Sequence, residues 1–249
     1  MNSNRKKQVG LLLIVIVIAG LLAVLTGGGV AQADSAPKPL HPGGTWYGNT
    51  YAEWSTEWWK WASALRADAT HPLIDDYKVK CDLGQDGDVW FLGGTYAESG
   101  VADRECDVPA GKALFFPIVN VLCSEFTGDD PAALLECAAN PTVPSDFEFQ
   151  MNPLSATIDG TEVKNLKKYY ALSEKTFTLG PLPKPNIFGA AKDAVGQGAS
   201  GGYYLLLPPL SVGEHVIAFA GEIVVLDPDG VPVYHFTLDI AYDLTVVDD

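Results

Sequence analysis

The strongest constraint on the fold is the strict alternation of apolar and polar side chains in FTLDIAYDLTVV, residues 236–247. Successive side chains of a β-strand point to opposite faces of its sheet, so this pattern predicts a strand with one buried and one solvated face. Asp-Gly separates two alternating segments in SATIDGTEV, residues 155–163, which is the strongest short-range signal of a β-hairpin. Further strands are predicted from short apolar runs rich in aromatic and branched residues. These runs are DVWFLGGT (88–95), KALFFPIV (112–119), YYLLLPPL (203–210) and HVIAFAGEIVVL (215–226).

Strands joined by tight turns, with few helices between them, are typical of an antiparallel β-sandwich or a jelly roll. DPDG (227–230) provides one such turn before the last strand. KPNIFGAAKDAVGQGASGG (184–202) lacks a sustained period and is predicted to be a long loop, either functional or mobile. With 249 residues, 47% of them hydrophobic, the chain is long enough to bury a substantial core. We therefore predict a single mainly β domain over residues 49–249 that carries an N-terminal helix.

Two helices are predicted beside the strands. Thr50 and Glu53 have the spacing of a capping box, which satisfies free N–H groups at a helix start. This helix must end before Pro72. DDPAALLECAAN (129–140) is predicted to be a short helix that starts at Asp130-Pro131. One face of the first helix is apolar and consists of Tyr51, Trp54, Trp58, Trp61 and Leu65.

The apolar stripe of the first helix is interpreted as the seam along which the helix packs on the core. Trp59 departs from that stripe, so we expect it at the edge of the seam or exposed to solvent. Trp59, helped by Trp46, is therefore the candidate for stacking on a ligand. Arg104 is a further candidate for contact with a ligand.

The N-terminal segment, residues 1–33, has the layout of a secretory signal peptide. Residues 5–7 are Arg-Lys-Lys, residues 11–26 form an uncharged apolar run, and VAQA ends at Ala33. The apolar run is also near the length of a membrane span, so an uncleaved N-terminal anchor is the alternative. In both cases the rest of the chain is secreted or held on the outer face of the cell envelope. Residues 34–48 are rich in Pro and Gly and are predicted to be a linker or irregular lead-in.

The charge of the chain argues against several classes of partner. Residues 1–33 contain three cations and no anions, so their removal changes the net charge from −15 to −18. Such a surface repels phosphate backbones and anionic lipid, which argues against nucleic acid and against lipid-surface binding beyond an N-terminal anchor. The simplest interpretation is solubility outside the cell. No sequence signal points to a particular oligomeric state.

The four cysteines are Cys81, Cys106, Cys123 and Cys137. An even number in an exported chain favours two disulfides. Three pairings are possible, and the short sequence separations favour Cys81–Cys106 and Cys123–Cys137. A zinc site is the weaker alternative, because no two cysteines have the C-x₂₋₄-C spacing.

Asp82, Asp86 and Asp88 form a weak candidate for a metal site. They lie close together beside a glycine, as in a calcium-binding loop. Gly93 stands where an EF-hand loop requires a bidentate glutamate, so an Asp-Gly turn between strands explains the pattern better.

A second weak metal candidate joins His215, His235 and Asp239, which could meet only through the fold. No histidine lies in an H-x-x-x-H or H-E-x-x-H motif, and the chain has neither a G-x-S-x-G elbow nor a phosphate-binding GKS or GKT. Glu53 and Glu57, one helical turn apart, are the most local carboxylate pair for glycoside hydrolysis. Helix capping and ion pairing explain these two residues better. The sequence therefore predicts no cofactor.

Four segments occur together over about residues 45–247: YAEWSTEWWKWA, CDLGQDGDVWFLGGT, RECDVPAGKALFFPIVN and GYYLLLPPLSVGEHVIAFAG. Their combination resembles an uncharacterised group of exported microbial proteins. That group shares a Trp-rich helix, a VWFL strand, a C-x-VPAGKA-x-FFP segment and a closing G-H-x-I strand. The resemblance implies an exported, single-domain protein and carries no known activity.

Three functions follow as hypotheses. The first is a non-enzymatic β-sandwich that binds carbohydrate or another cell-surface component, because exposed aromatic faces suit sugar rings. The second is an exported hydrolase acting on a polysaccharide or ester, for which the many carboxylates, Arg104 and the Gly-rich loop are the motivation. The third is a structural subunit of a surface layer or filament, in which β edges pair between copies.

Overall fold

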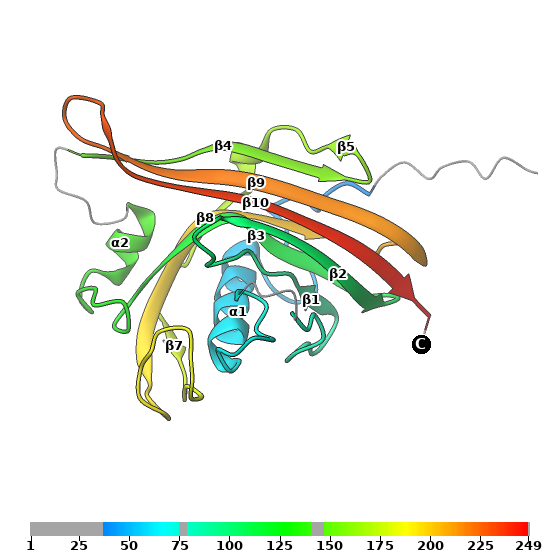
Figure 1. The fold of residues 1–249 in the computed structure, drawn as a ribbon, viewed down its shortest axis with the longest axis horizontal. Coiled ribbons are helices and arrows are strands. Elements are labelled where there is room, and N and C mark those ends of the chain that lie inside the picture. Colours follow the sequence, from blue (N-terminus) through cyan, green and yellow to red (C-terminus); the bar gives the residue numbers. More distant parts are fainter. Residues whose placement is uncertain (1–36, 75–78, 141–146, 249) are drawn as a thin grey trace, which may run out of the picture. The chain divides into compact units, whose positions relative to one another are not determined.

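The computed structural model describes residues 37–74, 79–140 and 147–248. These residues form ten strands, two α-helices and one short 3₁₀ helix, and the strands make two mixed sheets that pack on each other (Figure 1). The predicted mainly β sandwich is thereby confirmed. Residues 1–33, the predicted export segment, lie outside the described residues. Neither helix of the described ranges has the length and hydrophobicity of a membrane-spanning segment.

The first sheet, here called the inner sheet, has both faces covered. Almost every residue of its two central strands, β3 and β8, is buried or half-buried, which explains their continuous apolar sequences. Phe116 stacks on Phe219 of the second sheet at 4.9 Å, whereas Phe115 meets Tyr51 of the first helix at 5.9 Å. The strand order is β1-β3-β8-β6, and β7 also pairs with β8. The bounds are β1 Val89–Phe91, β3 Ala113–Ser124, β6 Tyr170–Leu172, β7 Phe177–Leu179 and β8 Gly196–Leu207.

The second sheet, here called the outer sheet, has one buried and one solvated face. Along the last strand, residues 238, 240, 242, 244 and 246 are buried and alternate with exposed or half-buried neighbours, which confirms the alternation predicted for residues 236–247. The predicted hairpin at Asp159-Gly160 is also present, with both residues at positive φ. The order is β2-β10-β9-β4-β5. The bounds are β2 Val101–Pro109, β4 Glu148–Ile158, β5 Thr161–Glu162, β9 Gly213–Leu226 and β10 Pro232–Val247. The 3₁₀ helix Leu166–Tyr169 follows β5.

Most strand pairs are antiparallel, as predicted, and each sheet also contains one parallel pair at an edge. These pairs are β1 with β3 and β2 with β10. They arise because the chain passes from the inner sheet to the outer sheet at β2 and returns at β3. Strand β2 was not predicted from the sequence: its buried positions include Arg104 and Cys106, so no apolar alternation marks it.

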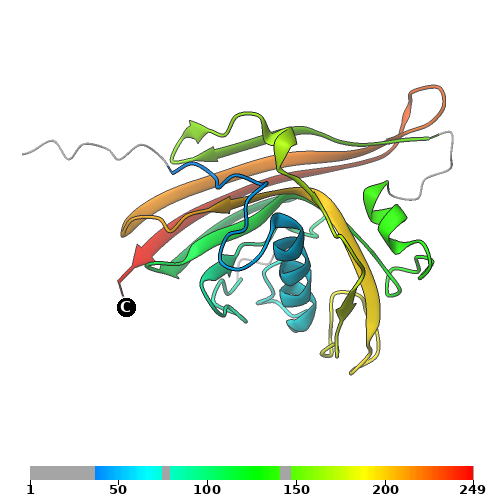
Figure 2. The ribbon, with the colours of Figure 1, turned by 180° about the vertical axis from the view of Figure 1, so that it is seen from behind.

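Helix α1, Tyr51–Ala64, lies against the inner sheet on the face away from the outer sheet (Figures 1 and 2). The predicted capping box is present: Glu53 N donates to Thr50 Oγ1 at 3.3 Å, and Thr50 N donates to Glu53 Oε2 at 2.8 Å. The indole N–H of Trp58 donates to Leu92 O at 2.9 Å. The tryptophans thus join α1 to the loops around the sheet as well as filling the core.

The prediction of a long loop over residues 184–202 is partly wrong. The second half of this stretch belongs to β8, a central strand of the inner sheet. Glycines in this strand let neighbouring backbone approach closely: a Cβ atom at Gly202 would lie 2.6 Å from Asn120 Cα. The preceding loop is held by buried Asn186, whose amide donates to Ala190 O at 2.9 Å. Gly-rich composition therefore hid a strand that must sit tightly against its neighbours.

Both disulfides pair as predicted. Cys81–Cys106 ties the loop before β1 to β2, with Cα atoms 5.8 Å apart, and Cys123–Cys137 has its Cα atoms 6.0 Å apart. Each closes a short loop and stabilises the fold by about 3 kcal/mol in the chain-entropy description. Two disulfides are typical of proteins that fold in an oxidising compartment.

Helix α2, Leu134–Ala139, is shorter than the helix predicted over residues 129–140. Asp130 Oδ1 accepts a hydrogen bond from Ala132 N at 2.9 Å, so Asp130 closes the turn in front of the helix and does not cap the helix itself. The Cys123–Cys137 disulfide joins α2 to β3 at the end of the inner sheet.

Candidate functional site

Trp59 does not form an exposed stacking surface, contrary to the prediction. Its side chain is 4% exposed, and its ring meets Trp58 edge-on at 4.9 Å. The side of α1 that faces the inner sheet includes the small residues Ser55 and Ala62, and Trp59 lies on that same side. The apolar stripe alone therefore misplaced the centre of the buried side. Trp46 is half-buried, packs on the same core and donates its indole N–H to His41 O at 2.8 Å.

Arg104 was expected at a ligand, and the structure places it in the interior at 6% exposure. Its Nη1 donates to Gly93 O at 3.0 Å and to Tyr242 Oη at 2.7 Å, and its guanidinium lies over the Tyr242 ring. The alternation of β2 turns Arg104 inward and its acidic neighbours outward. Arg104 therefore connects the loop after β1 to β10 and does not face an external ligand.

The predicted aspartate cluster does not gather into a metal site in the described structure. Asp82, Asp86 and Asp88 are all exposed in the loop before β1, and their carboxylates do not meet in a group of three ligand atoms. One group of described residues does bring three such atoms together, but both of its cysteines are in one disulfide, which leaves no thiolate for a metal. That group is Cys123, Asp129 and Cys137.

The second metal candidate is also separated by the fold. His235 of β10 lies opposite Val224 of β9. Val224 is nine residues from His215 along the same strand, so the two histidines are separated by about 30 Å. Each histidine has its own carboxylate: His215 Nδ1 lies 2.9 Å from Asp159, and His235 Nε2 lies 2.8 Å from Glu222. Asp239 belongs to the outward face of β10 between these two sites.

A groove of about 520 Å³ runs between the solvent face of α1 and the turn that joins β6 to β7. Glu53, Glu57 and Lys60 line it from the helix. Hydrogen bonds from the N-cap threonine lower the pKa of Glu53. A glycosidase needs one carboxyl group with a raised pKa as its general acid, so Glu53 does not suit that role. Glu57 is paired with Lys60 at 2.9 Å.

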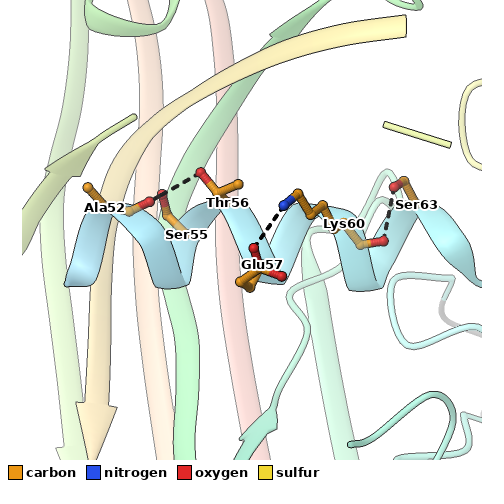
Figure 3. A network of polar contacts seen from close by, with 6 residues as sticks. All are labelled: Ala52, Ser55, Thr56, Glu57, Lys60 and Ser63. Atoms are coloured by element: carbon orange, nitrogen blue, oxygen red, sulfur yellow. Dashed lines mark hydrogen bonds and ion pairs between the residues drawn. The ribbon is translucent and has the colours of Figure 1, made fainter. Parts of the chain in front are cut away.

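The polar side chains along α1 mostly bond within the helix, as Figure 3 shows. Thr56 Oγ1 donates to Ala52 O at 3.3 Å, and Lys60 Nζ donates to Glu57 Oε1 at 2.9 Å. Such side-chain to helix contacts are local and satisfy the groups that line the groove. The helix side of the groove therefore offers few unpaired donors or acceptors to a ligand.

The solvated face of the outer sheet carries a concentrated negative charge. On this face Asp243 of β10 lies beside Glu105 of β2, in strands about 4.8 Å apart. Neighbouring like charges in a sheet are destabilising, and among the described residues none of these carboxylates pairs with a lysine or arginine. We call this surface the carboxylate face; it consists of Asp103, Glu105 and Asp107 of β2 and Asp239 and Asp243 of β10.

A shallow hollow of about 610 Å³ lies at one end of the carboxylate face. Glu105, Asp107 and Asp243 line it, together with Glu214 of β9. This surface was not predicted from the sequence, because β2 was not predicted. The signal was present as acidic residues at every second position from 103 to 107, the spacing that places them on one side of a strand.

Comparison with known proteins identifies no family. No family model matches the chain, and no curated protein matches it. Among solved structures, a cysteine protease inhibitor from Entamoeba histolytica is similar at 10% sequence identity and a TM-score of 0.18. The match covers 64% of this chain and 96% of the inhibitor. A likeness of this size supports no conclusion about function.

Proposed function

We propose that this chain is an exported binding protein that recognises a cationic component of a cell surface through its carboxylate face. The observation that carries the proposal is the set of five outward carboxylates on two adjacent strands without lysine or arginine partners among the described residues. A face of one sign attracts a cationic partner over a distance and speeds its association. The repulsion within the face is relieved when such a partner binds.

The chemistry of this face favours charge recognition over sugar stacking. The outward positions next to the carboxylates carry no aromatic side chain among the described residues: they include Ala220 and Ala241, and Val101 and Val216 lie directly opposite Asp239 and Asp243. Stacking on a sugar ring needs an exposed aromatic face. Trp59 is buried and Trp46 is half-buried, so the aromatic residues that motivated carbohydrate recognition do not supply one.

The sheet edges do not favour assembly into a filament. Pairing of β2 with β2 of another copy would place the acidic side chains of the two strands next to one another, which is a common protection of edge strands. The strands β1, β5, β6 and β7 are only two or three residues long. Strand β4 pairs with β5 only at Thr157 and Ile158, and its remaining edge is interrupted at Pro153, where the register shifts. We therefore prefer recognition of a separate cationic partner.

The test measures binding of the purified protein to an immobilised lysine-rich peptide at two salt concentrations. The variant Asp103→Asn/Glu105→Gln/Asp107→Asn should bind about tenfold more weakly, because three surface charge contacts of about 0.5 kcal/mol each are lost. The matched control Asp82→Asn/Asp86→Asn/Glu98→Gln removes the same charge from exposed positions outside the carboxylate face and should bind like the wild type.

Equal weakening in both variants would reduce the effect to net charge and contradict the proposal. Absence of binding to the cationic peptide would contradict it as well. A parallel glycan array tests the carbohydrate alternative: binding to a neutral glycan that is lost in Trp46→Ala would favour that alternative.

A further inference from the structure

A hydroxyl, an imidazole and a carboxylate form a chain of contacts where the β4–β5 turn meets the start of β9. Ser211 Oγ lies 3.2 Å from His215 Nε2, and His215 Nδ1 lies 2.9 Å from Asp159 Oδ2. This order of nucleophile, base and orienting carboxylate is the arrangement that activates serine for acyl transfer. We propose that Ser211, His215 and Asp159 form an ester-hydrolysing site beside the hollow of the carboxylate face, which His215 also lines.

The fold holds the carboxylate firmly. Asp159 is the first residue of the tight Asp-Gly turn and has a φ of 48°. Its backbone N–H donates to Val216 O at 2.8 Å, and its Oδ1 accepts from Val216 N at 2.9 Å. The other carboxylate oxygen, Oδ2, is thereby directed at His215. The imidazole is placed on β9 next to Val216, so one strand connection positions both groups.

The contact of His215 with Asp159 selects the tautomer that a general base needs. A carboxylate only accepts hydrogen bonds, so Nδ1 carries the proton that bonds to Asp159. In the neutral imidazole Nε2 is then the acceptor and faces the hydroxyl of Ser211. The carbonyl oxygen of Ser211 lies 2.9 Å from the same Nε2 and can accept from it once it is protonated. The carbonyl contact thus suits the protonated ring, and the 3.2 Å contact with Ser211 Oγ suits the neutral base.

The exposure of the three side chains differs in the way the reaction requires. Ser211 is exposed, whereas the side chain of His215 is only 10% exposed and that of Asp159 is 31% exposed. The nucleophile is open to a substrate while the base is shielded by its neighbours. The backbone N–H of Val212, next to the nucleophile, has no hydrogen-bond partner among the described residues and is a donor for an oxyanion.

The reaction needs only water as a second substrate. Ser211 Oγ attacks the acyl carbon of an ester while its proton passes to His215 Nε2. The bond from the acyl carbon to the alcohol oxygen breaks, and the alcohol leaves with that proton. Water then attacks the acyl-serine by the same route, which releases the carboxylic acid and restores the hydroxyl.

The position of Ser211 indicates the class of ester. An exposed nucleophile can reach an acyl group that projects from the surface of a large molecule, such as an O-acyl group on a polysaccharide. The neighbouring acidic residue Glu214 is exposed and disfavours anionic substrates. Short acyl groups on a neutral or cationic polymer therefore suit the site.

The chain contains a matched control in His235. This imidazole also pairs with a carboxylate, Glu222, and approaches a hydroxyl, that of Thr237 at 3.5 Å. Both partners meet the same atom, Nε2, so the carboxylate does not hold the opposite ring nitrogen and does not leave Nε2 free to accept a proton from the hydroxyl. His235→Gln should therefore leave ester hydrolysis unchanged.

The test combines labelling and kinetics on the full chain. A fluorophosphonate probe should add to Ser211, located by mass spectrometry, and the wild type should hydrolyse p-nitrophenyl acetate. Ser211→Ala should abolish the label, and both Ser211→Ala and His215→Gln should lower kcat/KM by at least about 100-fold. Asp159 acts as a positioning residue, so Asp159→Asn should lower kcat by at least about 100-fold with little change in KM.

Two results would overturn the proposal. One is a wild-type protein that takes no label at Ser211, which is independent of how any variant folds. The other is Ser211→Ala hydrolysing the ester as fast as the wild type, because an imidazole alone would then account for the activity. Binding to the lysine-rich peptide is unaffected by either result, so this proposal and the proposed function fail separately.

Discussion

At the scale of single residues, His71 is a completely buried imidazole that joins the end of α1 to the following turn. Its Nδ1 accepts from Leu73 N at 3.0 Å, so Nε2 carries the proton and donates to Ala62 O at 3.0 Å. That carbonyl belongs to the last turn of α1 and has no partner within the helix. Burial lowers the pKa of His71, with a smaller contribution in the same direction from Arg104.

This buried histidine predicts a pH dependence of stability. The folded state has the lower pKa, so below about pH 6.5 the unfolded state binds the proton more readily and stability falls as the pH drops. The loss is at most about 1.4 kcal/mol per pH unit. His71→Gln should have a lower stability at pH 7 and a shallower decline between pH 7 and pH 5, measured by urea unfolding. The exposed His41→Gln should retain the wild-type slope, and an unchanged slope in His71→Gln would contradict the argument.

At the scale of elements, strand β8 shows why composition alone misleads. Its first half, GQGASGG, has almost no side chains to bury, yet it pairs with β3, β6 and β7. Glycine is used there because backbone and side chains of other elements fill the space that a Cβ atom would take. A Gly-rich stretch is therefore compatible with a central strand when its neighbours approach closely.

Substitution of Gly202 tests this close packing. A methyl group there would lie 2.6 Å from Asn120 Cα, a backbone atom that cannot turn away, so Gly202→Ala should lower the free energy of unfolding by about 1–3 kcal/mol. Gly94→Ala is the control, because its Cβ atom would meet Leu238 at an ordinary 3.9 Å. The control should change stability by less than about 1 kcal/mol. Equal urea midpoints for the two variants would contradict the packing argument.

At the scale of the whole molecule, the inner sheet is the central layer, with α1 on one face and the outer sheet on the other (Figure 2). This layering leaves only the far face of the outer sheet to carry a regular array of charges. The disulfides act at two different places: Cys81–Cys106 ties a loop to the outer sheet, and Cys123–Cys137 ties α2 to the inner sheet. Each should therefore contribute separately to stability.

Removal of the α2 disulfide tests that separation. Cys123→Ala/Cys137→Ala should lower the free energy of unfolding by about 3 kcal/mol, because the cross-link no longer restricts the unfolded chain. Thermal unfolding measures the loss, and non-reducing mass spectrometry confirms that Cys81–Cys106 remains intact. An unfolding temperature equal to that of the wild type would show that the α2 cross-link does not stabilise the sandwich.

The sequence by itself determined the features that depend on residues adjacent in the chain. The capping box at Thr50, the Asp159-Gly160 turn and the alternation of residues 236–247 follow from local backbone chemistry and from the period of a strand. The short loops between cysteines likewise favoured the observed disulfide pairing.

Only the tertiary structure decided which elements lie against one another. It buried Trp59 by turning the side of α1 that carries Ser55 toward the inner sheet, and it assembled the carboxylate face by pairing β2 in parallel with β10. It also brought Asp159 to His215, 56 positions away in the chain. These outcomes depend on contacts between segments distant in sequence, and no local period or propensity encodes such contacts.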